Sequence, residues 1–508
     1  MKNRKTYRFR RVFGILLALF TLLSACSRQK AAGTRSGAEL RYGFASEPAT
    51  FDPLNPANTA DGRSILFNVF EGLVKPGTDG QLLPCLAESW TIEQGGAAYN
   101  FQLREGVLFH DGSGLTAADV KFTLDTAAAA GFEGFTQVEK TEIPDSRTVR
   151  ITLKYPDPEF LPYLTVGIVK DGSTGREKNA VGTGPYRIEN YKAQQSLTLK
   201  KFEGYWQQGL PYFEKVTIVF FADSSALVLG LQGGSIDGAT ITSALAQQLN
   251  PQRFDLAPGF SASVQMLALN NAVKPLDDIH VRQAVNYSID VQGIIDMAFF
   301  GRGEPSGSPL IPGLAAYYEK SLANAYPADT GTAQSLLAQA GYGEGEKKLT
   351  LEITVPSNFT MHIDTAQVIV GQLAKAGISA NIKLVDWATW LKDVYQNRDY
   401  QATIISLDAK TVSPRAFLSR YQSSADNNFI NFNNSAFDRV YSAALAEVDE
   451  EKRIALYREA QQIISDNAAS VYIQDIVGFK AFRGGAYGGA LNYPLYVIDF
   501  ASMYGTEK

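Results

Sequence analysis

The feature that most constrains the fold is a strand-to-helix transition near the middle of the chain. Residues 264–269 form a short apolar run that ends at two asparagines, which is typical of a buried strand entering a polar loop. After Pro275, Asp277 or Asp278 stands where a helix N-cap is expected, and apolar residues follow at helical spacing. Roughly 230 mature residues precede this transition and roughly 220 follow it, each enough for a core of its own. We therefore expect residues 263–290 to connect two lobes.

The N-terminus carries the pattern of an export signal. The first 25 residues hold six basic side chains and no acidic one, and an apolar run and two small residues precede Cys26. This pattern predicts a secretory signal peptide over residues 1–25, since the apolar run is too short to span a bilayer comfortably. The tetrapeptide that ends at Cys26 resembles the bacterial lipobox, so we expect a lipid on Cys26 and a flexible anchor and spacer over residues 26–38. The alternative is a simple signal peptide with an incidental cysteine.

Charge and cysteine content narrow the function classes. The formal net charge is −5, and removal of the six basic side chains of the signal leaves about −11 on the mature protein. So acidic an exported protein argues against a nucleic-acid partner and against a basic membrane-binding surface. Cys85 is the only other cysteine, so a lipidated protein has no internal disulfide, and Cys85 is expected to be a small buried side chain.

The second half of the chain alternates helical and strand patterns, which predicts an α/β lobe with a parallel or mixed sheet. Helices are expected over residues 332–340, 362–376 and 389–396, and strands over 349–355, 378–384 and 400–406. In the first half, Thr116 and Asp119 form a capping-box pattern at the start of a helix.

Residues 181–186, VGTGPY, predict a tight glycine turn. Its glycines suit a backbone that needs positive φ. A phosphate-binding loop is the weaker interpretation, because no Lys-Ser/Thr pair follows and no helix begins there.

No catalytic machinery is visible in the sequence. The three histidines, His110, His280 and His362, are widely separated, so neither a histidine-based triad nor a metal-binding pair is predicted, and each is expected on the surface or in a loop. Paired carboxylates stand at helix starts, where the helix dipole explains them. We expect no catalytic residue, no metal, no cofactor and no enzymatic activity.

Several long motifs, each occurring once and in a fixed order, resemble the bacterial extracellular solute-binding proteins of the peptide/nickel group. The main ones are EPATFDPLNP (47–56), FNVFEGLVKPGTDGQLLPCLAESW (67–90), YNFQLREGVLFHDGSGLTAADVKFTLD (99–125), GTGPYRIENY (182–191) and LALNNAVKPLDDIHVRQAVNYSID (267–290). The resemblance implies an α/β, two-lobe, periplasmic-binding-protein-like fold with mixed sheets and a small extra subdomain in lobe one. Lobe one is then expected at 39–267 with the subdomain at about 76–181, lobe two at 268–479, and a C-terminal return to lobe one at 480–508.

The resemblance also implies candidate ligand-binding residues. Ligand choice in this group depends on a loop that here is residues 405–418, ISLDAKTVSPRAFL. In dipeptide-binding members an aspartate of this loop holds the ligand's amino terminus, but alignment on the loop proline places Lys410 there. Two alternatives follow: Asp408 takes over this role, or Lys410 and Arg415 hold an anionic group of the ligand. Asn55, in the first motif, is a further candidate contact. Ile168 aligns loosely with an arginine of the nickel-chelate members. Because that arginine is replaced here, nickel capture by the same contacts is disfavoured.

Together these patterns predict the binding subunit of an ABC importer. It would capture an oligopeptide-like solute outside the cytoplasmic membrane and deliver it to permease and ATPase subunits, as a monomer anchored to the membrane by lipid, on the periplasmic or cell-surface side. One alternative is a binding subunit for a nickel chelate or another non-peptide solute such as an opine or oligosaccharide. A second alternative is a secreted hydrolase.

Overall fold

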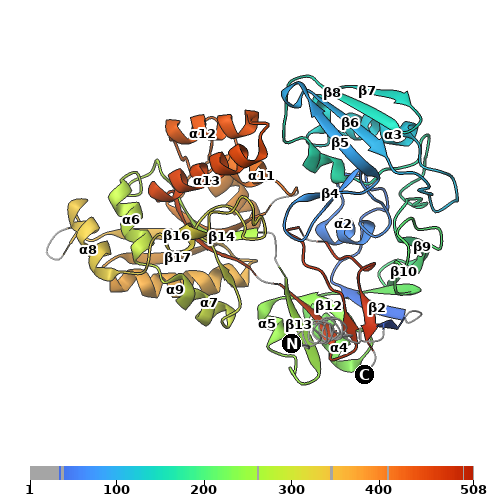
Figure 1. Cartoon of the computed structure of the whole chain (residues 1–508). Coiled ribbons are helices and arrows are strands. Elements are labelled where there is room, and N and C mark those ends of the chain that lie inside the picture. The colour runs from blue at the N-terminus through green and yellow to red at the C-terminus, as the bar shows by residue number, and fades with distance from the viewer. Residues whose placement is uncertain are drawn as a thin grey trace, which may run out of the picture.

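The structure is a computed structural model, and it describes residues 34–35, 39–259, 263–343, 347–408, 411–476, 478–495 and 497–506. Two α/β lobes lie side by side, each built on a mixed sheet, and a smaller antiparallel sheet stands at one end of lobe one (Figure 1). The two-lobe, mixed-sheet fold expected from the sequence is confirmed. Among the described residues, no helix combines the length and the apolar character needed to cross a membrane.

Lobe one is organised by a seven-stranded sheet in the order β13-β20-β12-β2-β11-β10-β9. Its strands are β2 (Glu39–Phe44), β9 (Tyr186–Lys192), β10 (Ser196–Lys201), β11 (Lys215–Phe220), β12 (Gly238–Ile241), β13 (Phe254–Gly259) and β20 (Gly478–Arg483). β2 runs parallel to both β11 and β12, so the carboxyl ends of these three strands lie at one edge of the sheet. The helices α2 (Ala60–Leu66), α4 (Ser224–Gly233) and α5 (Ser243–Ala246) belong to this lobe.

The small subdomain is a four-stranded antiparallel sheet in the order β5-β6-β8-β7, with α3 packed against it. Its elements are β5 (Ala87–Glu93), β6 (Ala98–Leu103), α3 (Ala117–Ala129), β7 (Val138–Asp145) and β8 (Thr148–Leu153). The predicted capping box is present at the start of α3, where Asp119 accepts a hydrogen bond from the backbone N–H of Thr116 over 2.7 Å. One continuous apolar cluster joins the subdomain to the main sheet of lobe one.

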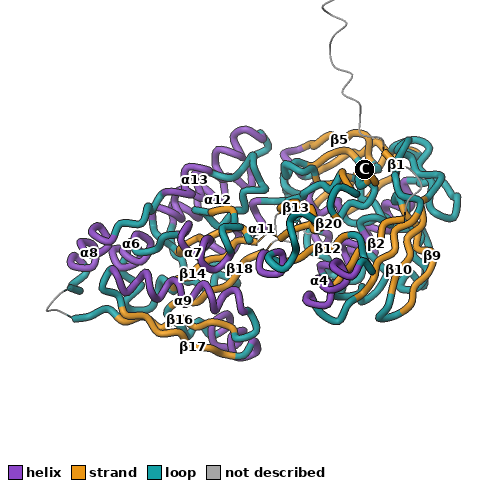
Figure 2. Tube along the Cα trace, turned by 90° about the horizontal axis from the view of Figure 1, so that it is seen from below, coloured by secondary structure: helices purple, strands orange, loops and turns teal. Residues whose placement is uncertain are grey.

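Lobe two is built on a six-stranded sheet in the order β15-β19-β14-β18-β16-β17. Its strands are β14 (Ser263–Leu269), β15 (Glu304–Pro305), β16 (Thr350–Pro356), β17 (Ser379–Val385), β18 (Ala402–Asp408) and β19 (Ser470–Asp475). Side chains of β14 alternate between two apolar clusters: Met266 belongs to one, and Leu267 to the other. Helices α12 (Ser435–Ala446) and α13 (Glu450–Asp466) pack on the first face, and α6 (Ile279–Tyr287), α7 (Val291–Phe299), α8 (Thr330–Gln339) and α9 (Thr360–Lys375) on the other (Figures 1 and 2).

Shorter elements complete the two lobes. The strands are β1 (Thr34–Arg35), β3 (Val74–Pro76), β4 (Leu82–Pro84), β21 (Tyr487–Gly488) and β22 (Tyr504–Thr506). The helical turns are η1 (Gln94–Gly96), η2 (Phe135–Gln137), η3 (Leu161–Thr165), η4 (Lys320–Asn324), α10 (Trp387–Thr389), the π-helix η5 (Trp390–Gln396), α11 (Pro414–Leu418) and η6 (Ser419–Tyr421).

The passage between the lobes differs from the one expected. β13 ends at Gly259 in the lobe-one sheet and β14 begins at Ser263 in the lobe-two sheet, so the boundary expected after residue 267 falls inside β14. The transition from β14 to α6 lies wholly within lobe two, because β14 hydrogen-bonds to β18 on one edge and β19 on the other. The predicted N-cap of α6 is present at Asp278.

The chain returns to lobe one at its end. β20 inserts between β13 and β12, and in Figure 1 its red ribbon lies among the green and blue strands of that lobe. Further on, the side-chain amide of Asn68 donates to the carbonyl of Ile498, and its oxygen accepts from the backbone N–H of Phe500, both over 2.8 Å. Because β20 begins at Gly478, the lobe-two boundary expected at residue 479 is slightly late.

The glycine turn at residues 181–186 is present, but for a different reason. Neither Gly182 nor Gly184 has positive φ. Instead the backbone of α2's C-terminal flank comes very close: a Cβ built on Gly182 would lie 2.0 Å from the carbonyl oxygen of Val69. The glycines therefore allow close backbone approach, and the expectation of positive φ is wrong.

Candidate ligand-binding site

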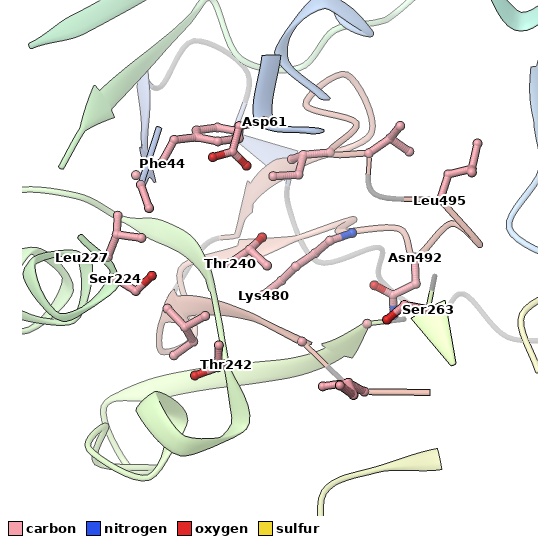
Figure 3. Close-up of a pocket in the computed structure, with 18 of the residues that line it drawn as sticks. Phe44, Asp61, Ser224, Leu227, Thr240, Thr242, Ser263, Lys480, Asn492 and Leu495 are labelled. Atoms are coloured by element: carbon pink, nitrogen blue, oxygen red, sulfur yellow. The ribbon is translucent and has the colours of Figure 1, made fainter. Parts of the chain in front are cut away.

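A cavity of about 400 Å³ lies between the two lobes (Figure 3). Lobe one contributes Tyr42, Gly43, Phe44, Ala45, Asp61, Ser224, Leu227, Thr240, Ile241, Thr242 and Gly259, lobe two contributes Ser263, Phe359, Met361, His362, Ser406 and Ile476, and the C-terminal return contributes Gly478, Lys480, Asn492, Tyr493, Leu495, Val497 and Ile498. The wall is mostly apolar, with hydroxyl, amide and charged groups set into it. This combination is typical of a small-molecule site.

The strand topology explains the position of the cavity. Phe44 ends β2 and Ile241 ends β12, two parallel neighbours in lobe one, and Ser406 lies near the carboxyl end of β18 in lobe two. Ligands of α/β sheets commonly bind outside the carboxyl ends of parallel strands, where the chain leaves the sheet in loops that diverge. Both lobes therefore present their ligand-binding edge to one shared space.

Two hydroxyl groups on the wall differ in what they bind. The Thr240 and Tyr42 hydroxyls share a hydrogen bond of 2.8 Å. The Ser406 hydroxyl is buried and has no hydrogen-bond partner among the described residues. A buried polar group without a partner costs free energy, so Ser406 is available to a bound solute in a way that Thr240 is not.

Lys480 contributes a buried cation to the cavity. Its side chain lies on β20 and is 6% exposed. Its ammonium group donates to the carbonyl oxygen of Leu491. Burial lowers the pKa of Lys480 to about 8, partly opposed by the negative charge of Asp499. The group is charged at neutral pH and becomes uncharged within reach of ordinary alkaline conditions.

His362 forms part of the lobe-two wall. It is buried, and the side-chain amide of Gln265 lies 3.1 Å from its Nδ1. Burial lowers its pKa to about 4, so it is neutral at pH 7. Because His362 is buried within helix α9, the expectation of a surface or loop histidine is wrong for it. His110 lies in a turn of lobe one, as expected, where it is half-buried and hydrogen-bonds to the carbonyl of Gly184.

The lobes meet again where the small subdomain touches lobe two. Arg415 Nη1 donates to Asp157 Oδ2 over 2.7 Å, and the Asp157 side chain is 2% exposed. Ser413 Oγ donates to Glu159 Oε2 over 3.2 Å, and Arg453 Nε lies 3.9 Å from Glu159 Oε1. Two acids of lobe one thus face two cations of lobe two. We call Asp157, Glu159, Arg415 and Arg453 the ionic contact.

Several residues proposed from the sequence lie away from the cavity. Ile168 is buried in the apolar core of lobe one, and its backbone N–H donates to the carbonyl of Glu71, so its side chain has neither the position nor the chemistry of a ligand contact. Asn55 uses its side-chain oxygen to accept from the N–H of Ala57 within its own turn. Arg415 is already paired with Asp157. None of these three lines the cavity.

The loop after β18 keeps one candidate near the cavity. Asp408 is exposed at the end of β18 and pairs in register with Ser263, which lines the cavity. Lys410 and the proposed lipid attachment residue Cys26 lie outside the described residues.

Lys480 and Ser406 were not identified from the sequence. A signal for Lys480 did exist: it is the only charged residue in the run VGFKAF, where it interrupts an otherwise apolar strand pattern. Ser406 had no comparable signal, because a serine near a strand end is ordinary.

Comparison with known proteins agrees with this architecture. Residues 81–429 match the profile of the bacterial extracellular solute-binding proteins, family 5. The chain is 30% identical to the glutathione-binding protein GsiB of Salmonella typhi, over 82% of this chain and 84% of that protein. It is 27% identical to heme-binding protein A of Haemophilus influenzae, over 92% and 94% of the two chains.

Solved structures share the fold across almost the whole chain. The substrate-binding protein CtaP of Listeria monocytogenes is 24% identical and superposes with a TM-score of 0.81, over 93% of this chain and all of that one. The murein tripeptide-binding protein MppA, in its unliganded open form, is 21% identical with a TM-score of 0.83, over 94% and 99%. DppA of Helicobacter pylori in complex with the peptide STSA is 24% identical with a TM-score of 0.71, over 93% and 99%.

Proposed function

The chain belongs to family 5 of the bacterial extracellular solute-binding proteins, and from this we propose that it captures a short peptide outside the cytoplasmic membrane for an ABC importer. The observation that carries the proposal is the cavity, because both lobes contribute to it at the carboxyl ends of their sheet strands. A ligand that contacts both lobes favours the arrangement in which they are closed on it.

The size and the lining of the cavity support a short peptide. A volume of about 400 Å³ lies at the small end of ordinary ligand pockets. The N–H and C=O groups of a bound peptide need hydrogen-bond partners, and the hydroxyls of Ser406 and Thr242 stand among apolar side chains that suit peptide side chains. The similarity to glutathione-binding relatives, whose ligand is a tripeptide, supports the same size class.

Asp408 and Lys410 are the candidate contacts in the loop that follows β18. Asp408 would accept a hydrogen bond from a free amino terminus, since its strand position places it beside Ser263. Lys410 would meet an anionic group of the solute.

The alternatives have less support. The matching relatives are solute-binding proteins, which does not favour a secreted hydrolase. Among the described residues that line the cavity, His362 is the histidine available for a nickel chelate, and its Nδ1 already lies against Gln265.

The test of function uses the full chain in mild detergent. Native mass spectrometry of protein purified from its own cells should show peptide masses that are lost on denaturation and refolding. Calorimetry with a defined tripeptide pool should then show saturable binding without hydrolysis, and scattering should show a smaller radius of gyration. Co-purification of a non-peptide solute alone, with no tripeptide binding, would contradict the peptide assignment.

We also propose that the protein is exported and held at the membrane by lipid on Cys26, because residues 23–26 match the lipobox pattern. Cys26→Ala should move the protein from the membrane fraction to the soluble fraction. Cys85→Ala is the matched control, since Cys85 is buried and should not affect anchoring. Membrane retention of the Cys26 variant would contradict lipid attachment there.

A further inference from the structure

Lys480 is the only Lys or Arg among the described residues that line the cavity. It stands on β20, the second strand from one edge of the seven-stranded sheet, so its position is fixed by β12 on one side and β13 on the other. Figure 3 shows its side chain extending along the wall, with Asn492 and Leu495 near its tip and Thr240 beside it. The Lys480 ammonium group therefore has a defined position relative to a solute in the cavity.

The protein leaves this cation only partly satisfied. An ammonium group has three N–H donors, and among the described residues Lys480 uses one, to the carbonyl of Leu491. No described carboxylate lies within ion-pair distance of it. The carboxylate that acts on it most, Asp499, accepts hydrogen bonds from the Tyr493 hydroxyl and the Ala501 N–H, both over 2.9 Å. Buried charges are normally paired, so an external anion is the natural missing partner.

We propose that Lys480 binds a free carboxylate of the solute, which makes this residue a determinant of specificity on the lobe-one side of the cavity. The proposal rests on the function proposed above and adds the chemical class of the group that enters lobe one. Phe44, Leu227 and Leu495 line the same cavity, and their apolar side chains lower its local dielectric, which strengthens the pairing. Asp61 lines the same cavity and disfavours a doubly charged anion such as phosphate.

Titration offers an independent signature. Burial lowers the pKa of Lys480 to about 8, so a solute carboxylate should lose affinity as pH rises above that value. The other groups near Lys480 do not titrate in this range: burial raises the pKa of Tyr42 and Tyr493, and burial lowers that of His362 to about 4. Asp61 lines the same cavity, and Asp499 is the carboxylate whose negative charge acts on Lys480.

The experiment compares the wild-type full chain with Lys480→Met, which keeps the length of the side chain and removes its charge. Lys200→Met is the matched control, because Lys200 is a half-exposed lysine on β10 of the same sheet. The probes are a tripeptide pool with free C-termini, the same pool with C-terminal amides, a pool of non-peptide monocarboxylic acids, and inorganic phosphate. Binding is measured by calorimetry at pH 7, and folding by circular dichroism.

Wild type and Lys200→Met should bind free-acid ligands at least about 30-fold more tightly than amides, and Lys480→Met should lose this preference with amide affinity unchanged. Binding of the non-peptide acids alone, with the same loss in Lys480→Met, would uphold Lys480 and refute the peptide assignment. Equal binding of acids and amides by wild type would uphold peptide capture and overturn the role of Lys480. Binding of phosphate alone, or of no carboxylate at all, would also overturn it.

If Lys480→Met does not fold, the wild type still decides the matter. Between pH 7 and pH 10 its affinity for free-acid ligands should fall at least about tenfold more than its affinity for amides, because titration of the ligand's amino terminus affects both pools alike. Parallel pH profiles for acids and amides would overturn the proposal.

Discussion

The two lobes meet in two places that treat polar groups in opposite ways. At the ionic contact, buried acids of lobe one face cations of lobe two, and Asp157 and Arg415 lie 2.7 Å apart. At the cavity, the Ser406 hydroxyl has no hydrogen-bond partner among the described residues, and the Lys480 ammonium group donates to a single carbonyl oxygen there. The Asp157–Arg415 pair of the first contact is satisfied by the chain itself, although Arg453 Nε there makes no hydrogen bond among the described residues, whereas the second contact contains groups that a solute can satisfy.

This difference indicates what each contact contributes. Complementary charges specify which surfaces of two bodies meet, while their net stabilisation is limited by the cost of desolvation. Polar groups without hydrogen-bond partners around a cavity lower the stability of the empty protein. A solute that hydrogen-bonds to them restores that stability. The ionic contact therefore positions the small subdomain against α11 and α13, and the cavity couples that arrangement to the solute.

The largest effect should come from breaking the ionic contact. Asp157→Ala leaves Arg415 largely buried beside Glu159 without its closest partner, so the free energy of unfolding should fall by about 3 kcal/mol or more. Urea denaturation measures the loss. Glu142→Ala is the control, because Glu142 pairs with Lys140 in an exposed position of the same subdomain and should have little effect. Equal changes in both variants would show that the ionic contact is no stronger than a surface pair.

Acidification should destabilise the fold through His362, the buried histidine at the cavity wall. The loss of folding stability should be somewhat smaller than that expected for Asp157→Ala. The pKa of His362 is about 4 in the folded protein against about 6.5 in the unfolded chain. Between those values the unfolded chain binds the proton more readily, so stability is full above pH 6.5 and falls as pH drops toward 4. At pH 4.5 the loss from this residue should be about 2.5 kcal/mol.

His362→Leu should remove that part of the acid sensitivity, measured as the difference in urea midpoint between pH 7 and pH 4.5. The wild type retains a similar contribution from His110 in lobe one, whose pKa burial also lowers to about 4. An unchanged acid response in His362→Leu would mean that the cavity wall is solvated at this histidine.

The smallest effect on stability should come from Ser406. Its hydroxyl lacks a partner in the described structure, so Ser406→Ala should leave the free energy of unfolding within about 0.5 kcal/mol of wild type or raise it slightly. The same change should weaken tripeptide binding about 3- to 10-fold, the value of one hydrogen bond. Ser379→Ala on exposed β17 is the control for both measurements. A clear loss of stability in Ser406→Ala would show that its hydroxyl supports the fold.

Local signals in the sequence predicted local structure well. The N-cap at Asp278, the capping box at Thr116 and the apolar run of β14 each depend on neighbours a few residues away, and each is present. The motifs that resemble the solute-binding proteins also predicted the two-lobe fold.

Long-range placement was harder to predict. Asp157 and Arg415 are 258 residues apart, and nothing in either segment indicates the other. The passage between the lobes was placed too late because β14 is buried on both faces, so its apolar run could belong to either sheet. Ile168 was proposed from an alignment, and only its burial in the core of lobe one shows that it cannot meet a polar ligand.

The insertion of β20 between β13 and β12 affects how the protein is made. β13 is hydrogen-bonded in its sheet only to β20, which follows it by about 220 residues, so a ribosome adding about 5 to 20 residues per second separates the two by roughly 10 to 45 s. During that interval the facing edges of β12 and β13 are unpaired and able to join other chains. A strand made near the end of synthesis thus completes a sheet whose other strands all lie before residue 260. The facing edges of β12 and β13 therefore need shielding from other chains until β20 has been made.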